Sequence, residues 1–144
     1  MLDDLPANLG MILMLVTRDF EHRLAEDLRA RGVTGVGKRH QEVFLYLGRH
    51  GPSRSVDLAH AAGIRPQSMV VIIQELEELG LIERRPDPQD SRAKLVNYTA
   101  KGKAFIRELG ISTRKVWDQY AALAGAEQQE TMIGGLQQLL SAAE

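Results

Sequence analysis

The chain has 144 residues and a mass of 16.0 kDa; 44% of its residues are hydrophobic, 26% are charged, and its formal net charge is −1. This composition is typical of one globular domain and excludes a disordered chain. The sequence contains no cysteine, which excludes disulfides, cysteine-based zinc sites and cysteine nucleophiles. No apolar run approaches the roughly 18 residues of a transmembrane helix, and the acidic first ten residues lack a basic signal region. We therefore expect a cytoplasmic protein with no membrane partner.

Charge is distributed unevenly along the chain. Residues 38–103 contain 11 Lys and Arg against 8 Asp and Glu, whereas the two flanks together contain 7 against 11. A basic middle between acidic ends indicates an anion-facing module flanked by segments that pack or pair.

The first predicted element is a long amphipathic helix with apolar residues in steps of three and four. These residues are Leu5, Leu9, Ile12, Leu13, Val16, Phe20, Leu24 and Leu28. Gly32, Gly35 and Gly37 end this helix.

Three shorter helices follow. The first covers about residues 39–48, with Val43, Phe44 and Leu47 on its apolar face, and Gly51-Pro52 forms a turn after it. Ser55 is predicted to cap the next helix, which contains Val56, Leu58, Ala59 and Ala62 and ends at Gly63.

The third short helix is predicted from Pro66, suited to the first helical turn, to Leu79, with Gly80 as its C′ residue. Its apolar face comprises Met69, Ile72, Ile73, Leu76 and Leu79. The opposite face comprises Gln67, Ser68, Val71, Gln74, Glu75 and Glu78.

The periodicity then changes to that of a β-hairpin. Residues 81–85 predict a strand, residues 86–92 a long loop with two prolines, and residues 94–99 a returning strand with alternating side chains. Thr99 is predicted to cap a helix that runs from Ala100 past Trp117 towards Leu123. Gly125 interrupts it, and the last helix, from about Glu127, carries Met132, Ile133, Leu136, Leu139 and Leu140.

Short helices followed by a basic hairpin favour DNA binding. A helix is about 10–12 Å across and fits a major groove about 12 Å wide. On the helix headed by Arg65, Gln67 and Gln74 suit adenine, Ser68 suits a base or a phosphate, and Val71 suits a thymine methyl. A plain amphipathic helix with a solvated side explains the same face equally well.

The hairpin favours the DNA-binding interpretation. We expect Arg92, at a protruding tip, to enter the minor groove, with Asp90 holding its guanidinium in a bidentate pair. Arg84, Arg85 and Lys94, at the base of the hairpin, are expected near phosphates.

Four sequence segments resemble the MarR family (multiple antibiotic resistance regulators) of transcription factors. They are Ser55-Val56-Asp57-Leu58-Ala59, Leu76-Glu77-Glu78-Leu79-Gly80-Leu81-Ile82-Glu83-Arg84-Arg85, Pro86-Asp87-Pro88-Gln89-Asp90-Ser91-Arg92 and Tyr98-Thr99-Ala100-Lys101-Gly102. The resemblance implies a mainly α fold with a small β-hairpin wing. In this fold residues 36–103 form the winged helix-turn-helix, and residues 1–35 and 104–144 form dimerisation helices.

The resemblance also implies a homodimeric, sequence-specific transcriptional regulator, most simply a repressor, that binds a pseudo-palindromic operator. By the same resemblance, a small aromatic or phenolic effector bound between the dimerisation helices and the winged module releases it. Arg92 is then the minor-groove arginine, Asp90 its orienting partner, and residues 65–74 the recognition segment. The apolar stripes of the first and last helices independently favour association, because a small winged domain cannot cover both.

Other signals are weaker. Residues 32–38 match part of a phosphate-binding loop, but Arg39 stands where Ser or Thr would hold magnesium. His22, His40, His50 and His60 are scattered and expected at the surface, so we predict no metal, cofactor or catalytic site and no enzymatic activity. The alternative function is a winged-helix module that binds protein without specific DNA binding.

Overall fold

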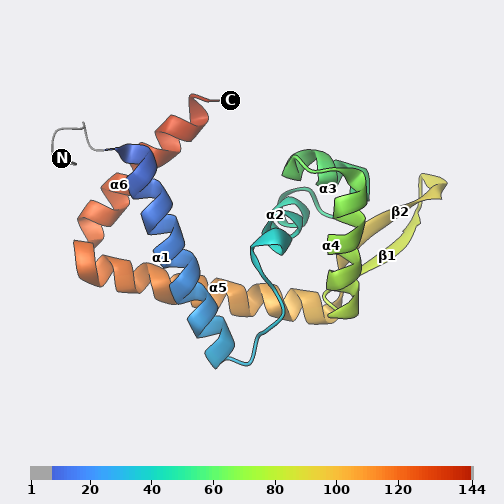
Figure 1. The fold of residues 1–144 in the computed structure, drawn as a ribbon, viewed down its shortest axis with the longest axis horizontal. Helices are drawn as coiled ribbons and strands as arrows, with labels where there is room; N and C mark the ends of the chain where they lie inside the picture. Colours follow the sequence, from blue (N-terminus) through green and yellow to red (C-terminus); the bar gives the residue numbers. More distant parts are fainter. Residues whose placement is uncertain (1–7, 144) are drawn as a thin grey trace. The chain divides into compact units, whose positions relative to one another are not determined.

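The structure is a computed structural model that describes residues 8–143. Figure 1 shows the order of its elements along the chain. They are α1 (Leu9–Ala30), the 3-10 helix η1 (Lys38–His40), α2 (Gln41–His50), α3 (Ser55–Ala62), α4 (Pro66–Glu78), β1 (Ile82–Asp87), β2 (Asp90–Tyr98), α5 (Ala100–Ala124) and α6 (Ala126–Ser141).

The chain divides into two compact units. Residues 32–108 form one, called here the winged unit, and residues 1–31 with 109–144 form the other, called the helical unit. Helix α5 contributes its first nine residues to the winged unit and its remainder to the helical unit.

The winged unit has a hydrophobic core to which its three short helices contribute most of the buried residues. Helix α2 buries Val43, Phe44 and Leu47, at the positions that its periodicity predicts. Helices α3 and α4 contribute five more buried residues, namely Leu58, Ala59, Met69, Ile73 and Leu76. The turns after α2 and α3 place Gly51 and Gly63 at φ of 72° and 64°, a backbone conformation that favours glycine.

The caps differ from the prediction at one helix. Arg54, not Ser55, is the N-cap of α3, and no side chain caps that helix. Ser55 is the first helical residue. At α5 the prediction is confirmed, because Thr99 Oγ1 accepts a hydrogen bond from the Gly102 amide at 3.0 Å.

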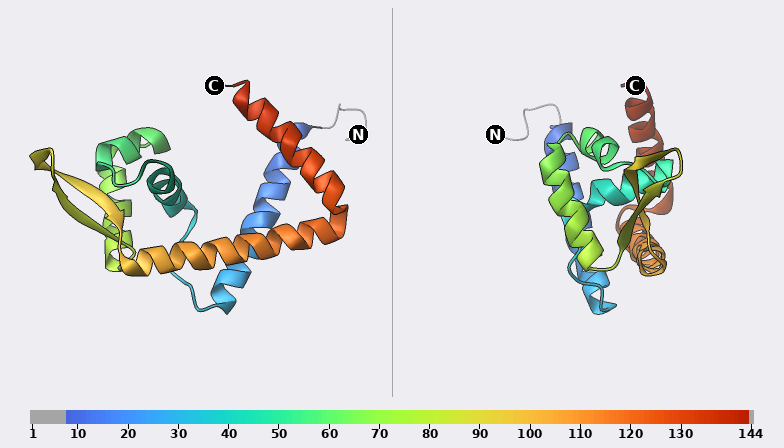
Figure 2. Two further views of the ribbon diagram at one scale, coloured as in Figure 1. Left: turned by 180° about the vertical axis from the view of Figure 1, so that it is seen from behind. Right: turned by 90° about the vertical axis from the view of Figure 1, so that its right-hand side faces the viewer.

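The two strands form an antiparallel hairpin, seen from two directions in Figure 2. Ile82 pairs with Tyr98 and Arg85 with Leu95. Ser53 adds an isolated bridge to Val96, through hydrogen bonds of 3.1 and 2.8 Å between their backbones, which ties the hairpin to the start of α3.

Helix α5 leaves the hairpin by a close approach that only glycine permits. A Cβ added at Gly102 would lie 1.9 Å from the carbonyl oxygen of Leu81. The buried ring of Phe105 then packs 5.0 Å from that of Phe44, between ring centroids, which joins the start of α5 to the core.

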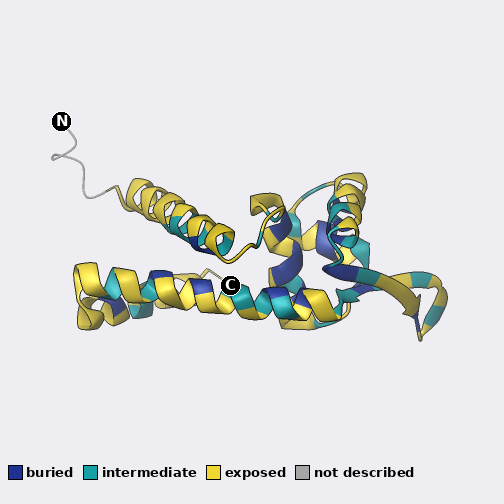
Figure 3. Cartoon of the chain, turned by 90° about the horizontal axis from the view of Figure 1, so that it is seen from below, coloured by how far each residue is buried: buried dark blue, intermediate teal, exposed yellow. Residues whose placement is uncertain are grey.

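The helical unit has the opposite pattern of burial. Within residues 8–143, its buried hydrophobic residue is Val116, whereas Asp27, Ser112 and Gln129 are buried polar residues. Figure 3 shows α1 mostly in the colour of exposed residues. The predicted helical stripe is confirmed from Leu9 onward, and Leu5 lies outside the described residues.

Candidate nucleic-acid interface

Helix α4 presents its N-terminus and one polar face. Arg65 is its N-cap and is exposed, and Pro66 is its first residue. No side chain caps this end, so its first amides are free to donate to an anion at the positive end of the helix dipole.

The exposed face of α4 contains the residues that sequence periodicity assigns to it. Met69, Ile73 and Leu76 are buried. The residues exposed on the other side are Gln67, Ser68, Val70, Val71, Gln74 and Glu78. Burial of three aliphatic residues therefore fixes which side of α4 faces outward.

Glu75 departs from that expectation, because it is bound by other residues of the winged unit. Its carboxylate lies 2.9 Å from Arg39 Nη2 and 3.0 Å from His40 Nε2. His40 is only 3% exposed, so the expectation of a surface histidine is wrong at this position.

The ring of His40 has a defined orientation. Its Nδ1 accepts a hydrogen bond from the Gly37 amide at 2.9 Å, so Nε2 is the nitrogen that donates to Glu75. His40 therefore ties α4 to the segment before α2. Sequence reasoning missed this contact, since the two residues are 35 positions apart and no local pattern joins them.

The turn of the hairpin is tighter than predicted. Strand β1 extends to Asp87 and β2 begins at Asp90, which leaves Pro88 and Gln89 as a two-residue turn in place of the expected loop over 86–92. The Asp87 side chain accepts the Gln89 amide at 2.9 Å and stabilises the turn.

Arg92 lies in β2, two residues after its start, and not at the tip. The register shifts between Pro86, which pairs with Lys94, and Asp87, which pairs with Asp90. Residues 91–93 therefore bulge between these two pairs, and the Arg92 side chain is exposed.

Asp90 orients the backbone of Arg92. Its Oδ1 accepts the Arg92 amide at 3.0 Å, while Oδ2 lies 3.7 Å from Arg54 Nη2. The expected bidentate pair with the Arg92 guanidinium is absent from the described residues, because the carboxylate is directed at the amide and at Arg54.

A partly buried ion pair fixes the hairpin to the N-terminus of α3. Arg54 Nε and Nη2 donate to Asp87 Oδ2 at 3.2 and 2.7 Å, and Asp87 is 8% exposed. The Gln89 amide and then Arg54 lower the pKa of the Asp87 carboxyl below its usual value. Asp87 in turn raises the pKa of Arg54. The hairpin is therefore joined to the start of α3 by this ion pair as well as by the Ser53–Val96 bridge.

The basic residues predicted to contact DNA differ in whether a carboxylate of the chain already binds them. The Arg84 guanidinium donates twice to Glu77, at 2.9 and 2.7 Å, which raises the pKa of Arg84. Arg85 pairs with Glu83 at 2.6 Å. Arg65, Arg92 and Lys94 are exposed, and their side chains form no ion pair with the residues that the structure describes. These three are the cations best placed to bind an anion.

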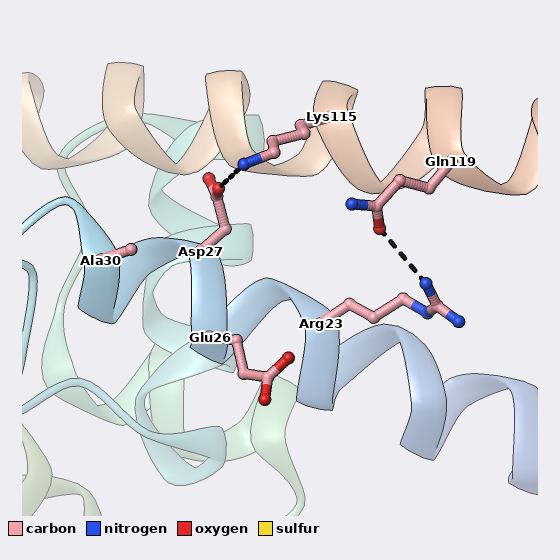
Figure 4. A pocket seen from close by; sticks show the side chains of 6 residues that line it. All are labelled: Arg23, Glu26, Asp27, Ala30, Lys115 and Gln119. Carbon is pink, nitrogen blue, oxygen red and sulfur yellow. Dashed lines mark hydrogen bonds and ion pairs between the residues drawn. The ribbon is translucent and has the colours of Figure 1, made fainter.

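A recess in the helical unit is lined by charged residues that are already bound (Figure 4). Asp27 accepts hydrogen bonds from Lys115 Nζ, Ser112 Oγ and Arg31 Nε. Arg23 donates to Asp19 at 2.7 Å and Glu26 lies 3.3 Å from His22. The lining of the recess holds two cations, Arg23 and Lys115, and two carboxylates, so its charges balance.

No group of three or more His, Asp or Glu residues suited to a metal occurs among the described residues. The segment that resembles part of a phosphate-binding loop runs from the end of α1 to η1, without the preceding strand that such a loop requires. Within residues 8–143, no helix has the length and apolar character to cross a membrane.

Two helices joined by a tight turn and followed by a two-stranded hairpin define a winged helix-turn-helix protein. Residues 34–93 match the model of the MarR family. Residues 34–93 are thus similar to the MarR family, a family of DNA-binding transcriptional regulators.

Solved structures agree with this fold over most of the chain. A probable transcriptional regulator from Pseudomonas aeruginosa is 26% identical, with a TM-score of 0.73, and the match covers 96% of this chain and 99% of that one. A MarR family protein from Bacillus stearothermophilus is 15% identical, with a TM-score of 0.78 over 95% and 94% of the two chains. Wild-type MarR from E. coli is 20% identical, with a TM-score of 0.74 over 92% and 96%.

Proposed function

We propose that the chain is a homodimeric transcriptional repressor that binds a pseudo-palindromic DNA operator through α4 and the hairpin. One observation carries the proposal: a winged unit of the MarR family exposes the polar face of α4, Arg65 and Arg92 while burying the aliphatic face of α4.

Helix α4 enters the major groove in this proposal. Its free N-terminal amides and Arg65 bind a phosphate, which sets its position on the duplex. Gln67, Ser68, Val71 and Gln74 then face the base edges.

The hairpin binds the backbone and the adjacent minor groove. Arg92 enters the minor groove, and Lys94 binds a phosphate. Arg84 and Arg85 reach phosphates only after releasing Glu77 and Glu83, so their contributions are smaller. Asp90 contributes indirectly, because it holds the Arg92 amide and thereby fixes the bulge that carries the arginine.

Association through the helical unit gives the regulator its two-fold symmetry. Exposed apolar residues concentrate on α1 and α6, and large exposed apolar patches mark association surfaces. They are Leu9, Met11, Ile12, Leu13, Met14, Leu15, Val16, Met132, Leu139 and Leu140. A two-fold dimer presents two recognition helices about 34–36 Å apart and reads half-sites about 10 bp apart.

DNA is released when the dimer changes from one conformation to another that differs in the distance between its two α4 helices. An effector weakens DNA binding only to the extent that it binds the conformation unable to bind DNA more tightly than the DNA-binding conformation. The family resemblance favours a small aromatic or phenolic anion. Thiol oxidation of this sequence is excluded as the trigger, since it has no cysteine.

The test is selection of bound duplexes from a random DNA pool with the full chain at low salt. We expect enrichment of an inverted repeat, which reports class and symmetry together. If the pool yields no enriched duplex, the DNA-binding proposal fails and the protein-binding alternative gains support.

A further inference from the structure

The exposed face of α4 contains a stripe of four residues, two glutamines and two valines. Gln67, Val70, Val71 and Gln74 follow the spacing i, i+3, i+4, i+7, and all four are exposed. Val70 is 42% exposed and Val71 54%, so neither valine is explained by packing within the chain. At 1.5 Å per residue, the stripe is about 10 Å long.

Two of the three carboxylates that follow Val71 on α4 are bound by other residues, and the third, Glu78, lies exposed beyond Gln74 at the C-terminal end of the helix. Helix α4 contains no Lys or Arg. Glu75 is bound by Arg39 and His40, and Glu77 by Arg84. The surface that α4 offers in its middle is therefore composed of two amides and two aliphatic side chains.

These side chains match one kind of base pair. Guanine presents two acceptors in the major groove, which Arg or Lys reads best. Adenine presents one acceptor and one donor, which suit a Gln amide, and thymine presents a methyl group, which suits an aliphatic side chain.

We propose that the stripe reads consecutive A·T base pairs, with the amides of Gln67 and Gln74 on adenines and Val70 and Val71 on thymine methyls. The proposal rests on the proposed function, in which α4 enters the major groove. A stripe of about 10 Å spans about three steps of 3.4 Å along one strand. The centre of each half-site is then A·T, and Arg65 and Arg92 bind outside it.

Thymine methyls are tested by replacing thymines of the selected duplex with deoxyuridine, one position at a time. The replacement removes the 5-methyl and keeps the hydrogen-bonding pattern. For the wild-type chain we expect about three- to fivefold weaker binding at one or two positions of each half-site. In Val70→Ala or Val71→Ala, the same replacement is expected to change the affinity less than twofold.

Val56→Ala is the matched control, because Val56 is 57% exposed and lies on α3, outside the stripe. It is expected to keep the full deoxyuridine effect. Adenine contacts are tested in the same way with 7-deazaadenine, which lacks the N7 acceptor, against Gln67→Ala and Gln74→Ala.

The outcomes separate the two proposals. A selected inverted repeat whose half-site centres are G·C, or deoxyuridine and 7-deazaadenine duplexes that bind the wild-type chain unchanged, would overturn the A·T inference and leave DNA binding intact. Failure to select any duplex would overturn both. All four substituted stripe residues are exposed, and circular dichroism checks that each variant is folded.

Discussion

The two units of the chain differ in the kinds of residue that they bury and expose. The winged unit buries a hydrophobic core of its own, and its helix α4 exposes Gln67 and Gln74 together with two valines. The helical unit exposes apolar residues along α1 and α6 and buries an ionised carboxylate, Asp27. The first unit covers its hydrophobic core within one chain, whereas the second leaves exposed an apolar surface of the kind that marks association. In the proposed function, reading DNA and pairing chains therefore belong to different parts of the molecule.

We expect the largest effect from a substitution in the core of the winged unit, measured as a loss of free energy of unfolding. Leu58 is 1% exposed, so Leu58→Ala should lower the free energy of unfolding by about 2–5 kcal/mol, measured by urea denaturation. Leu139→Ala, at a residue 58% exposed in the helical unit, is the control at a concentration where the chain is monomeric. If the two variants lose the same free energy of unfolding, the two units do not differ in burial as described.

The next effect tests association. Leu139→Glu should convert the dimer to a monomer in analytical ultracentrifugation, because it places a charge in an apolar interface. Its affinity for the inverted repeat should fall by about 100-fold or more, since one half-site contact is lost. Leu45→Glu, at a leucine of the winged unit with similar exposure (54%), should remain dimeric. A dimeric Leu139→Glu variant would remove α6 from the proposed interface.

A smaller effect tests the wing. Arg92→Ala should reduce the slope of log affinity against log salt by about 0.9 per wing, because one cation leaves the DNA. Arg114→Ala removes the same charge from an exposed site in the helical unit and should leave the slope unchanged. If both variants keep the wild-type slope, Arg92 does not bind DNA.

The smallest effect concerns pH and the buried carboxylate. Hydrogen bonds from Lys115, Ser112 and Arg31 hold the pKa of the Asp27 carboxyl far below its usual value. Because this pKa is lower in the folded than in the unfolded chain, the stabilisation is complete above about pH 4 and declines as the pH falls below it. Asp27→Asn should lower the melting temperature at pH 7, and the difference from wild type should shrink towards pH 3.

Asp118→Asn is the control for this pH series, because Asp118 is an exposed carboxylate of α5 that pairs with Arg114. It should change the melting temperature little at any pH. A difference between Asp27→Asn and wild type that stays constant from pH 7 to pH 3 would exclude the ionised Asp27 as the source of stability.

The sequence predicted the helices and their buried faces well, since these depend on local periodicity. Met69, Ile73 and Leu76 follow from spacing alone, and the Thr99 cap from its place before a helix. The errors arise where distant residues decide the structure. Asp87 shortens the hairpin turn by binding both Gln89 and Arg54, which lies 33 positions away. Likewise, no local pattern predicts that Glu75 turns to His40, or that Glu77 occupies Arg84.

The most direct test of the account is a titration of the full chain onto the selected duplex and onto a scrambled duplex of the same composition, at the same salt concentration. We expect the selected duplex to bind at least about 1,000-fold more tightly than the scrambled one, with saturation at two chains per duplex. Equal affinity for the two duplexes would contradict it.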